Sequence, residues 1–201
     1  MNAGFDLSRV SAGFADPVAA SQAVFRNSLE ALSHPGQLVD IVSSAKAPVG
    51  VHAASCALLL ALLDQDTLLW LSPGLAGGDA PGYFRFHTGC TLTAEPASAD
   101  FALVAQPAEL PLLEAFAGGS EAYPDRSATL VVQVDSLEAG HGWTLSGPGI
   151  RSTRCLAADG LGEGFVSQWA QNRRGFPCGV DVFLACGTRV AGLPRTTRLE
   201  A

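Results

Sequence analysis

The sequence predicts an α/β domain in which a mixed central β-sheet is flanked by helices on both faces. Apolar runs of strand length alternate with segments of helical length. The strand runs are continuously apolar, which is typical of strands buried on both faces of a sheet. The 201 residues contain neither an internal repeat nor a linker. We therefore expect a single domain over 1–201, with residues 1–15 as a flexible N-terminal segment.

The first helix is predicted from its start signal and its apolar stripe. Asp16 can cap the helix, and Pro17 suits the first helical position. Phe25, Leu29 and Leu32 then recur at helical spacing, before a His-Pro-Gly turn. The other elements expected in the first half are a strand at 38–42, a buried helix at 51–63, a strand at 68–71 and a short element containing Arg85 and His87.

The second half contains the clearest strand of the chain, the Thr-Leu-Val-Val-Gln-Val run at 129–134. The segment 143–146 is expected to pair beside this strand. A helix is expected over 161–174, because Phe165 and Trp169 stand four residues apart. The remaining elements expected are a strand at 101–105, a helix at 110–116, a strand at 181–186 and a polar–apolar segment at 188–199.

The composition excludes some classes of protein. A hydrophobic fraction of 48% excludes intrinsic disorder, and a net charge of −7 argues against general nucleic-acid binding. Charged residues make up only 15% of the chain, whereas a typical soluble domain has about 25%. A surface with so few charges is either rich in small polar residues or covered by other subunits.

Lys46 is the only lysine, and this limits the possible cofactor sites. It is followed by Ala47 and Pro48, so the chain has no GxxxxGK[ST] phosphate loop. A Schiff base with pyridoxal phosphate would have to use Lys46, which stands in a turn-like segment. A pyridoxal-phosphate enzyme is therefore the weakest of three functional hypotheses, and we expect no cofactor.

The remaining composition points to the cytoplasm. Five cysteines without a CxxC pair are typical of reduced thiols in a cytosolic protein. The first fifteen residues lack a signal-peptide pattern, and the longest apolar run is far shorter than the roughly 20 residues of a membrane helix. The four histidines do not stand at ligand spacing from one another, so we expect no metal site.

Two arginine-containing motifs are the candidate ligand residues. Arg85 and His87 stand in an Arg-Phe-His-Thr segment, and Arg195 and Thr196 stand in an Arg-Thr-Thr-Arg segment. Guanidinium groups bind phosphate oxygens in pairs, and hydroxyl groups can complete the shell. These residues could bind a small anion, or they could cap carbonyl groups and contact another subunit. No catalytic residue is identified, because no acid–base pair stands out.

Several short motifs follow one another in a characteristic order. They are Phe25-Arg26 with Pro35-Gly36, the segment 66–72, Arg85-Phe86-His87-Thr88, the segment 175–181 with Cys186-Gly187, and Leu193-Pro194-Arg195-Thr196-Thr197. In this order and spacing they resemble the PhnH family, the H subunit of the bacterial carbon–phosphorus lyase core complex. The likeness extends from about Asp16 to Leu199.

The resemblance implies a fold, a set of partners and a role. The fold would be similar to the large domain of pyridoxal-phosphate-dependent transferases, without the cofactor site. Members of the family form homodimers alone and join the G, I and J subunits in a cytoplasmic complex. That complex, a transferase of the ribose 1-methylphosphonate 5-triphosphate synthase type, would replace the adenine of ATP by a phosphonate at C1 of the ribose. Its product would be a ribose 1-phosphonate 5-triphosphate.

Two main hypotheses follow. The first is a required, non-catalytic subunit of this complex, which binds neither nucleic acid nor membrane. The alternative is a phosphate- or phosphonate-binding protein or enzyme that uses a cluster of Arg85, His87 and Arg195. The alternative requires these side chains to surround one pocket, whereas guanidinium groups held in separate ion pairs argue against it.

Overall fold

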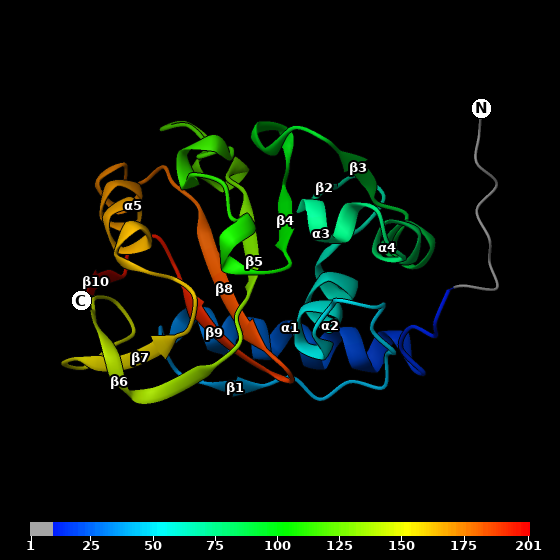
Figure 1. The fold of residues 1–201 in the computed structure, drawn as a ribbon, viewed down its shortest axis with the longest axis horizontal. Helices are drawn as coiled ribbons and strands as arrows, with labels where there is room; N and C mark the ends of the chain where they lie inside the picture. The colour runs from blue at the N-terminus through cyan, green and yellow to red at the C-terminus, as the bar shows by residue number, and fades with distance from the viewer. Residues whose placement is uncertain (1–9) are drawn as a thin grey trace.

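The fold, described over residues 10–201 from a computed structural model, is organised around a seven-stranded sheet (Figure 1). The strand order is β1-β9-β8-β5-β4-β2-β3. Five of these strands run parallel, and β9 is antiparallel to both of its neighbours, so the sheet is mixed as predicted. Its strands are β1 (Val39–Asp40), β2 (Leu68–Leu71), β3 (Thr91–Thr93), β4 (Phe101–Val104), β5 (Thr129–Gln133), β8 (Asp181–Cys186) and β9 (Arg189–Leu193).

The strands form the centre of the molecule because apolar side chains cover both of their faces. On β5, Leu130 and Val132 belong to one buried cluster and Val131 to the other. The same alternation places Leu103 of β4 and Phe183 of β8 beside Val131. Successive side chains of a strand point to opposite faces, so continuous apolar runs generate two cores that share one sheet.

The core that contains Val131 is formed with helices α1 (Pro17–Ser33), α2 (Ala53–Leu62), α3 (Pro73–Ala76) and α4 (Ala80–Thr88). The predicted N-cap is confirmed, since the Asp16 carboxylate accepts the Ala19 N–H at 3.1 Å. Helix α1 lies directly on β9, where a Cβ added to Gly192 would stand 2.4 Å from the Ala31 carbonyl oxygen. The predicted helix at 51–63 is also confirmed, and six consecutive residues of α2 are buried.

The opposite face is covered by α5 (Glu163–Arg174) and by a second, three-stranded sheet of order β10-β6-β7 (Figure 1). Its strands are β6 (Leu137–Ser146), β7 (Arg154–Ala158) and β10 (Arg198–Glu200). The expectation that 143–146 pairs beside β5 is wrong. Strand β5 already has β4 and β8 as neighbours, and Trp143 of β6 instead stacks on Phe165 of α5 at 5.5 Å. Helices therefore cover one face, and a helix and a small sheet share the other.

The expectation of a helix at 110–116 is also wrong. This segment contains the 3₁₀ turn η4 (Leu113–Ala115), and three further turns are η2 (Pro96–Ser98), η3 (Pro107–Glu109) and η5 (Pro124–Arg126). Pro111 disfavours a helical conformation at Leu110, and Gly118-Gly119 follow soon after, so too few residues remain for a stable helix. The other long elements that the sequence predicted, namely the strands at 68–71, 101–105, 129–134 and 181–186 and the helix at 161–174, are confirmed within a few residues.

The segment expected to be flexible lies partly outside the described residues, which begin at Val10. Residues 11–15 run beside the loop at 43–47. There the Ser11 hydroxyl donates to the Lys46 carbonyl at 2.6 Å, and the Lys46 N–H donates to the Ala12 carbonyl at 2.8 Å. Among the helices of residues 10–201, none combines the length and the apolar character that crossing a membrane requires.

Candidate functional site

The carboxyl ends of the parallel strands are the usual ligand-binding edge of an α/β sheet. In this protein Gln133, the last residue of β5, occupies that edge and is only 2% exposed. Its Nε2 donates to the carbonyls of Gly50 at 2.8 Å and Ala105 at 3.2 Å, and its Oε1 accepts the His52 N–H at 2.6 Å. The side chain thus ties three loops together at the end of β5.

Residues around the carboxyl ends of neighbouring strands also form hydrogen bonds within the chain. After β2, the buried Ser72 hydroxyl accepts the Ala105 N–H at 2.9 Å. Glu109 accepts the Gly74 N–H at 2.9 Å, and hydrogen bonds from Ser72 and from that N–H hold the pKa of Glu109 below its usual range. After β8, the Nδ1 atom of His52 lies 3.2 Å from the Ala185 carbonyl oxygen. The polar groups at this edge bond to the chain itself.

Lys46 lies outside this edge, in the loop that contacts residues 11–15. Ser43 and Lys46 stand at the spacing of an SxxK motif. In the structure the Ser43 hydroxyl accepts the Ala45 N–H at 3.0 Å, so it stabilises a local turn.

The Arg195 guanidinium is held on several sides. It bonds both carboxylate oxygens of Asp181, the hydroxyl of Ser127, and the carbonyls of Pro124 at 3.0 Å and Pro177 at 3.2 Å. The side chain is 12% exposed, and that of Asp181 is 22% exposed. The Arg195 fork joins the segments around 124–127, 177 and 181, as a structural arginine does.

The other motif residues lie elsewhere. Arg85 is exposed on the last turn of α4, and Nε2 of His87 lies 3.0 Å from the Ser11 carbonyl oxygen. The carbonyl of Thr196 accepts a bond from the Arg173 side chain at 3.4 Å. Helix α4 and β10 lie at opposite ends of the molecule (Figure 1). Arg195 and Thr196 are neighbours in the sequence. The structure does not bring them to one pocket with Arg85 and His87.

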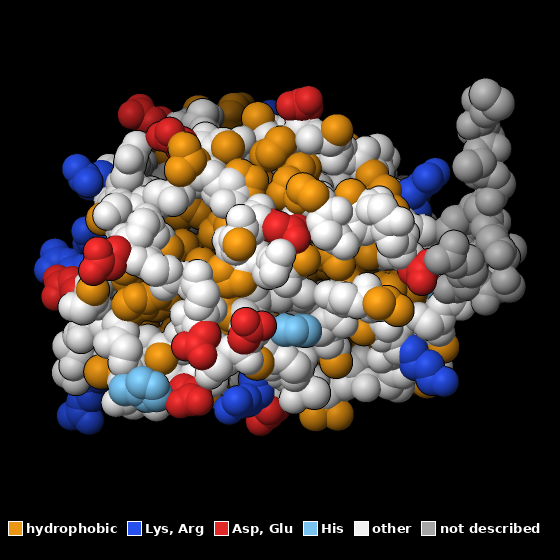
Figure 2. Space-filling view, viewed as in Figure 1, with side chains coloured by type: hydrophobic (Ala, Val, Ile, Leu, Met, Phe, Trp, Pro, Cys, Tyr) orange, Lys and Arg blue, Asp and Glu red, His pale blue; other side chains and the backbone are white. Residues whose placement is uncertain are grey.

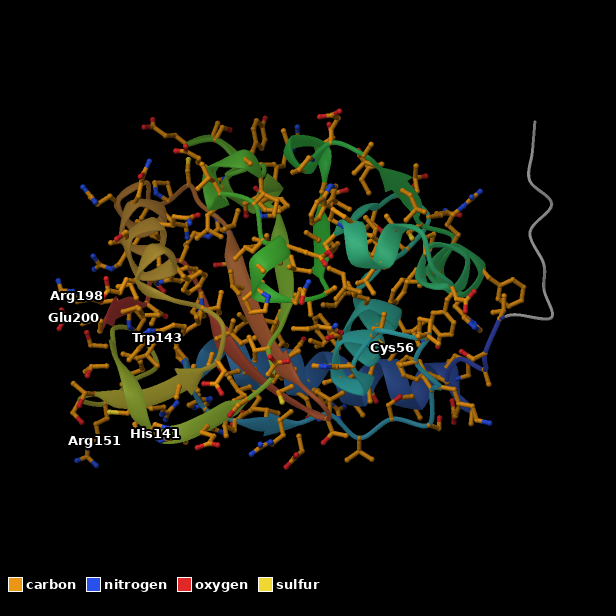
Figure 3. All side chains as sticks on the ribbon, viewed as in Figure 1. Cys56, His141, Trp143, Arg151, Arg198 and Glu200 are labelled. Carbon is orange, nitrogen blue, oxygen red and sulfur yellow. The ribbon has the colours of Figure 1, made fainter. Side chains whose placement is uncertain are left out.

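Other reactive groups are dispersed (Figure 3). Cys56 is buried on α2, where its thiol donates to the Tyr83 hydroxyl at 3.4 Å and burial raises its pKa to about 11. His141 and Arg198 lie on the small sheet, beside the exposed carboxylates of Glu138 and Glu200 respectively. Over residues 10–201, no three metal-ligating side chains gather into a possible metal site.

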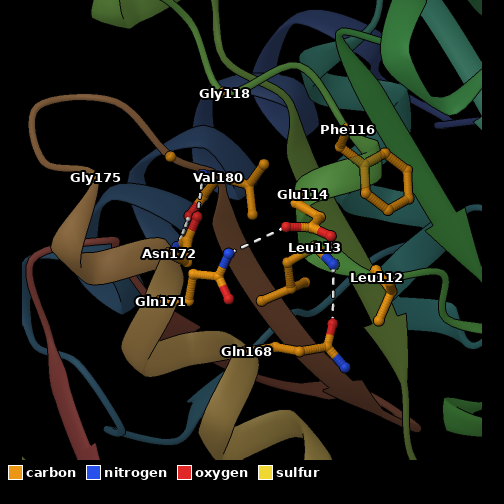
Figure 4. A pocket seen from close by; sticks show the side chains of 11 residues that line it. Leu112, Leu113, Glu114, Phe116, Gly118, Gln168, Gln171, Asn172, Gly175 and Val180 are labelled. Atoms are coloured by element: carbon orange, nitrogen blue, oxygen red, sulfur yellow. Dashed lines mark hydrogen bonds between the residues drawn. The ribbon is translucent and has the colours of Figure 1, made fainter.

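Two surface pockets are better candidates than these dispersed groups. The first, of about 280 Å³, lies between η4 and α5, and we call it the α5 pocket (Figure 4). It is lined by Leu112, Leu113, Glu114, Phe116, Gly118, Gln168, Gln171, Asn172, Gly175, Gly179 and Val180. The second, of about 560 Å³, lies beside the edge strand β3, and residues such as Trp70, Leu92 and Pro96 make it largely apolar. Neither pocket could be predicted from the sequence, because each is formed by side chains from separate segments of the chain.

Large apolar side chains are also exposed on the surface, and Figure 2 shows hydrophobic side chains gathered over the central part of one face. On α1, Phe25 and Leu29 are 46% and 51% exposed, although their spacing predicted a core-facing stripe. The buried stripe of α1 contains Val24 and Ala31 instead. Within residues 10–201, the other exposed large hydrophobic residues are Val18, Val42, Val49, Phe86, Leu112, Tyr123 and Phe176. Exposed apolar groups of this size are typical of subunit contacts when they adjoin one another.

Comparison with known proteins gives consistent matches along almost the whole chain. A family model described as "Bacterial phosphonate metabolism protein (PhnH)" matches residues 12–200. The chain is 42% identical over 190 residues to "Alpha-D-ribose 1-methylphosphonate 5-triphosphate synthase subunit PhnH" of Rhizobium meliloti (strain 1021), covering 94% of this chain and 95% of that protein. It is 32% identical over 186 residues to "Putative C-P lyase subunit protein HtxG" of Stutzerimonas stutzeri, covering 89% and 85%. The chain therefore belongs to the PhnH family.

Proposed function

We propose that this protein is a required, non-catalytic subunit of a carbon–phosphorus lyase core complex that makes a ribose 1-phosphonate 5-triphosphate from ATP and a phosphonate. The observation that carries the proposal is the end-to-end match to a protein named as a subunit of ribose 1-methylphosphonate 5-triphosphate synthase. The second relative is named as a carbon–phosphorus lyase subunit, which supports the same assembly.

The local chemistry supports a role in assembly. The groups at the carboxyl edge of the sheet are engaged with one another through Gln133, Ser72 and His52. The surface carries exposed large apolar side chains such as Phe25 and Leu29, which a partner could cover. Complex formation would bury apolar surface. The hydrogen bonds within the chain would keep the subunit rigid as the partners bind.

The partners we propose are the G, I and J subunits, and the isolated chain would form a homodimer. We place the assembly in the cytoplasm, which agrees with the free thiols of Cys56, Cys90, Cys155, Cys178 and Cys186. We also propose that the fold follows the large domain of pyridoxal-phosphate-dependent transferases without their cofactor site. The mixed seven-stranded sheet supports this likeness.

The candidate site residues then take two kinds of role. Arg195 and Thr196 stabilise the segment between β9 and β10, since both take part in bonds within the chain. Arg85 is exposed on α4 next to Phe86, whose side chain is 54% exposed. We propose that this turn of α4, with His87 holding it against Ser11, contributes to a subunit contact.

Co-expression with the G, I and J subunits of the same organism tests the proposal. A heteromer that contains this chain, measured by gel filtration with in-line mass determination, is the expected result. Omission of this chain should then lower or abolish synthesis of the ribose phosphonate by the remaining subunits. A chain that elutes alone as a dimer in the presence of all three subunits would count against the proposal.

A further inference from the structure

The α5 pocket has one polar wall and one apolar wall (Figure 4). The polar wall consists of Gln168, Gln171 and Asn172, which stand at i, i+3 and i+4 and therefore share one face of α5. The apolar wall includes Leu113, Phe116 and Val180. A volume of about 280 Å³ is enough for a long side chain.

Hydrogen bonds hold the polar wall in position. Gln168 Oε1 accepts the Leu113 N–H at 2.9 Å, which ties α5 to η4. Asn172 accepts the Val180 N–H at 2.8 Å and donates to the Val180 carbonyl at 2.9 Å. At the mouth, Gln171 Nε2 donates to Glu114 Oε2 at 3.0 Å. The orientation of the Gln171 amide is thus set, with its oxygen directed away from Glu114.

Two acceptor atoms at the mouth remain without a hydrogen-bond partner within residues 10–201. They are Oε1 of Glu114, which carries part of the negative charge of the carboxylate, and Oε1 of Gln171. No cation of that part of the chain forms an ion pair with Glu114. The arginines at the end of α5 bond elsewhere, Arg173 to the Thr196 carbonyl and Arg174 to the Ala170 carbonyl. The pocket therefore presents acceptors and negative charge to whatever enters it.

The surroundings indicate a protein contact. Leu112 lines the pocket and is 55% exposed, and Phe176, which follows the lining residue Gly175, is 62% exposed. A partner that covered these apolar side chains would also remove water from Glu114. An unpaired carboxylate is costly to bury, so that partner must supply a cation or several donors. The charge of −7 on the whole chain favours a basic partner surface in the same way.

We propose that the α5 pocket receives an arginine side chain from a partner subunit of the core complex. The guanidinium would donate to the Glu114 carboxylate and to Gln171 Oε1, and its aliphatic stem would lie against Leu113 and Phe116. Arginine satisfies both requirements, because its planar fork offers several donors and its stem packs on apolar groups. Arginines in small pockets are also frequent among the residues that dominate the binding energy of interfaces.

The inference rests on the proposed function, and its test separates the two. The wild-type chain and the variants E114Q and E114R are each co-expressed with the G, I and J subunits. In a second measurement, the affinity of each purified chain for the complex of the G, I and J subunits is determined. We expect E114Q to weaken the association about tenfold or more, and E114R to weaken it further by charge repulsion. The matched control is E163Q, an exposed acidic residue in the first turn of the same helix, which should leave the affinity unchanged.

Each outcome is decisive for one of the two claims. Failure of the wild-type chain to join the complex contradicts the proposed function. Normal association of E114Q and E114R, when the wild type associates, overturns the arginine contact and leaves the subunit role intact. Thermal unfolding of the isolated variants identifies any fold defect, and none is expected because Glu114 is exposed.

A charge-swap experiment gives independent support. Exposed arginines of the partner subunits are replaced one at a time by glutamate and combined with E114R. Recovery of binding for one combination identifies the arginine, whereas no recovery for any of them contradicts the proposal. If the isolated protein instead binds ATP or methylphosphonate and E114Q abolishes that binding, the pocket is a ligand site and the proposal is wrong.

Discussion

The Oε1 atom of Gln133 accepts the backbone N–H of His52 at 2.6 Å, which joins the end of β5 to the start of α2 across 81 positions of sequence. The same side chain donates to the carbonyls of Gly50 and Ala105. One buried carboxamide thereby satisfies three backbone groups at the edge where related sheet architectures bind ligands. This bond gives a physical reason for treating the carboxyl edge as part of the scaffold.

Replacement of Gln133 by leucine, which has a similar size, should be strongly destabilising. The variant Q133L leaves the His52 N–H and two carbonyl groups without their partner in a buried setting, at a cost of about 2–4 kcal/mol. The free energy of unfolding from urea titrations measures the effect. The exposed Gln65 is the control, and Q65L should change stability by less than about 0.5 kcal/mol. Equal effects of the two substitutions would show that the Gln133 bonds are unimportant.

The two arginines of the Arg-Thr-Thr-Arg segment should differ sharply in their contribution to stability. Arg195 bonds Asp181, Ser127 and two carbonyls, and a lysine cannot reproduce that fork. We expect R195K to lower the free energy of unfolding by about 1–3 kcal/mol. Arg198 is 57% exposed and lies 4.0 Å from Glu200, so R198K should have almost no effect. Chemical denaturation of both variants checks this, and an R195K protein as stable as R198K contradicts the structural role.

Gly149 and Gly140 form a matched pair for a test of backbone packing. Both adopt a positive φ, of 81° and 94°, and alanine at such a position costs about 1–2 kcal/mol. A Cβ at Gly149 would stand 2.1 Å from the Ser33 carbonyl oxygen, whereas a Cβ at Gly140 meets nothing within 4 Å. We therefore expect G149A to be destabilised by at least about 2 kcal/mol more than G140A. Thermal unfolding of the two variants provides the comparison, and similar midpoints would mean that the turn does not pack on α1.

The buried thiol of Cys56 should make stability depend on pH in the alkaline range. Burial raises its pKa from 9.0 to about 11, so the folded state retains a proton that the unfolded state releases above pH 9. The stabilisation is complete below pH 9 and is lost as the pH rises from 9 through about 11. Urea unfolding at several pH values should show a steeper alkaline decline for the wild type than for C56A. Parallel declines would mean that this thiol does not contribute.

The long elements of the fold could be predicted from sequence because their signals are local. The Asp16-Pro17 start, the apolar run of α2 and the buried strands each depend on neighbouring residues, and all are confirmed. The small sheet could not be predicted in the same way. Whether β6 pairs with β5 or with β7 depends on which edges are free and on the contact of Trp143 with Phe165, and neither is local.

The candidate site was less predictable for a related reason. The composition of the Arg85 and Arg195 motifs indicates what their side chains can bind, whereas their function depends on what lies beside them. Arg195 meets Asp181 and the turn at 124–127, so its charge is used within the chain. Glu114 and Gln171 were overlooked because they lie on segments 57 positions apart that only the folded chain brings together.

The most direct test of the account is the mass of the assembly that this chain forms with the G, I and J subunits after co-expression. Gel filtration with in-line mass determination should show a single heteromeric species that contains all four chains. That result would support the proposal that this chain is a subunit whose surface, including the α5 pocket, contacts partner subunits. A separate peak with the mass of a dimer of this chain, beside a complex of the other three, would contradict the central claim.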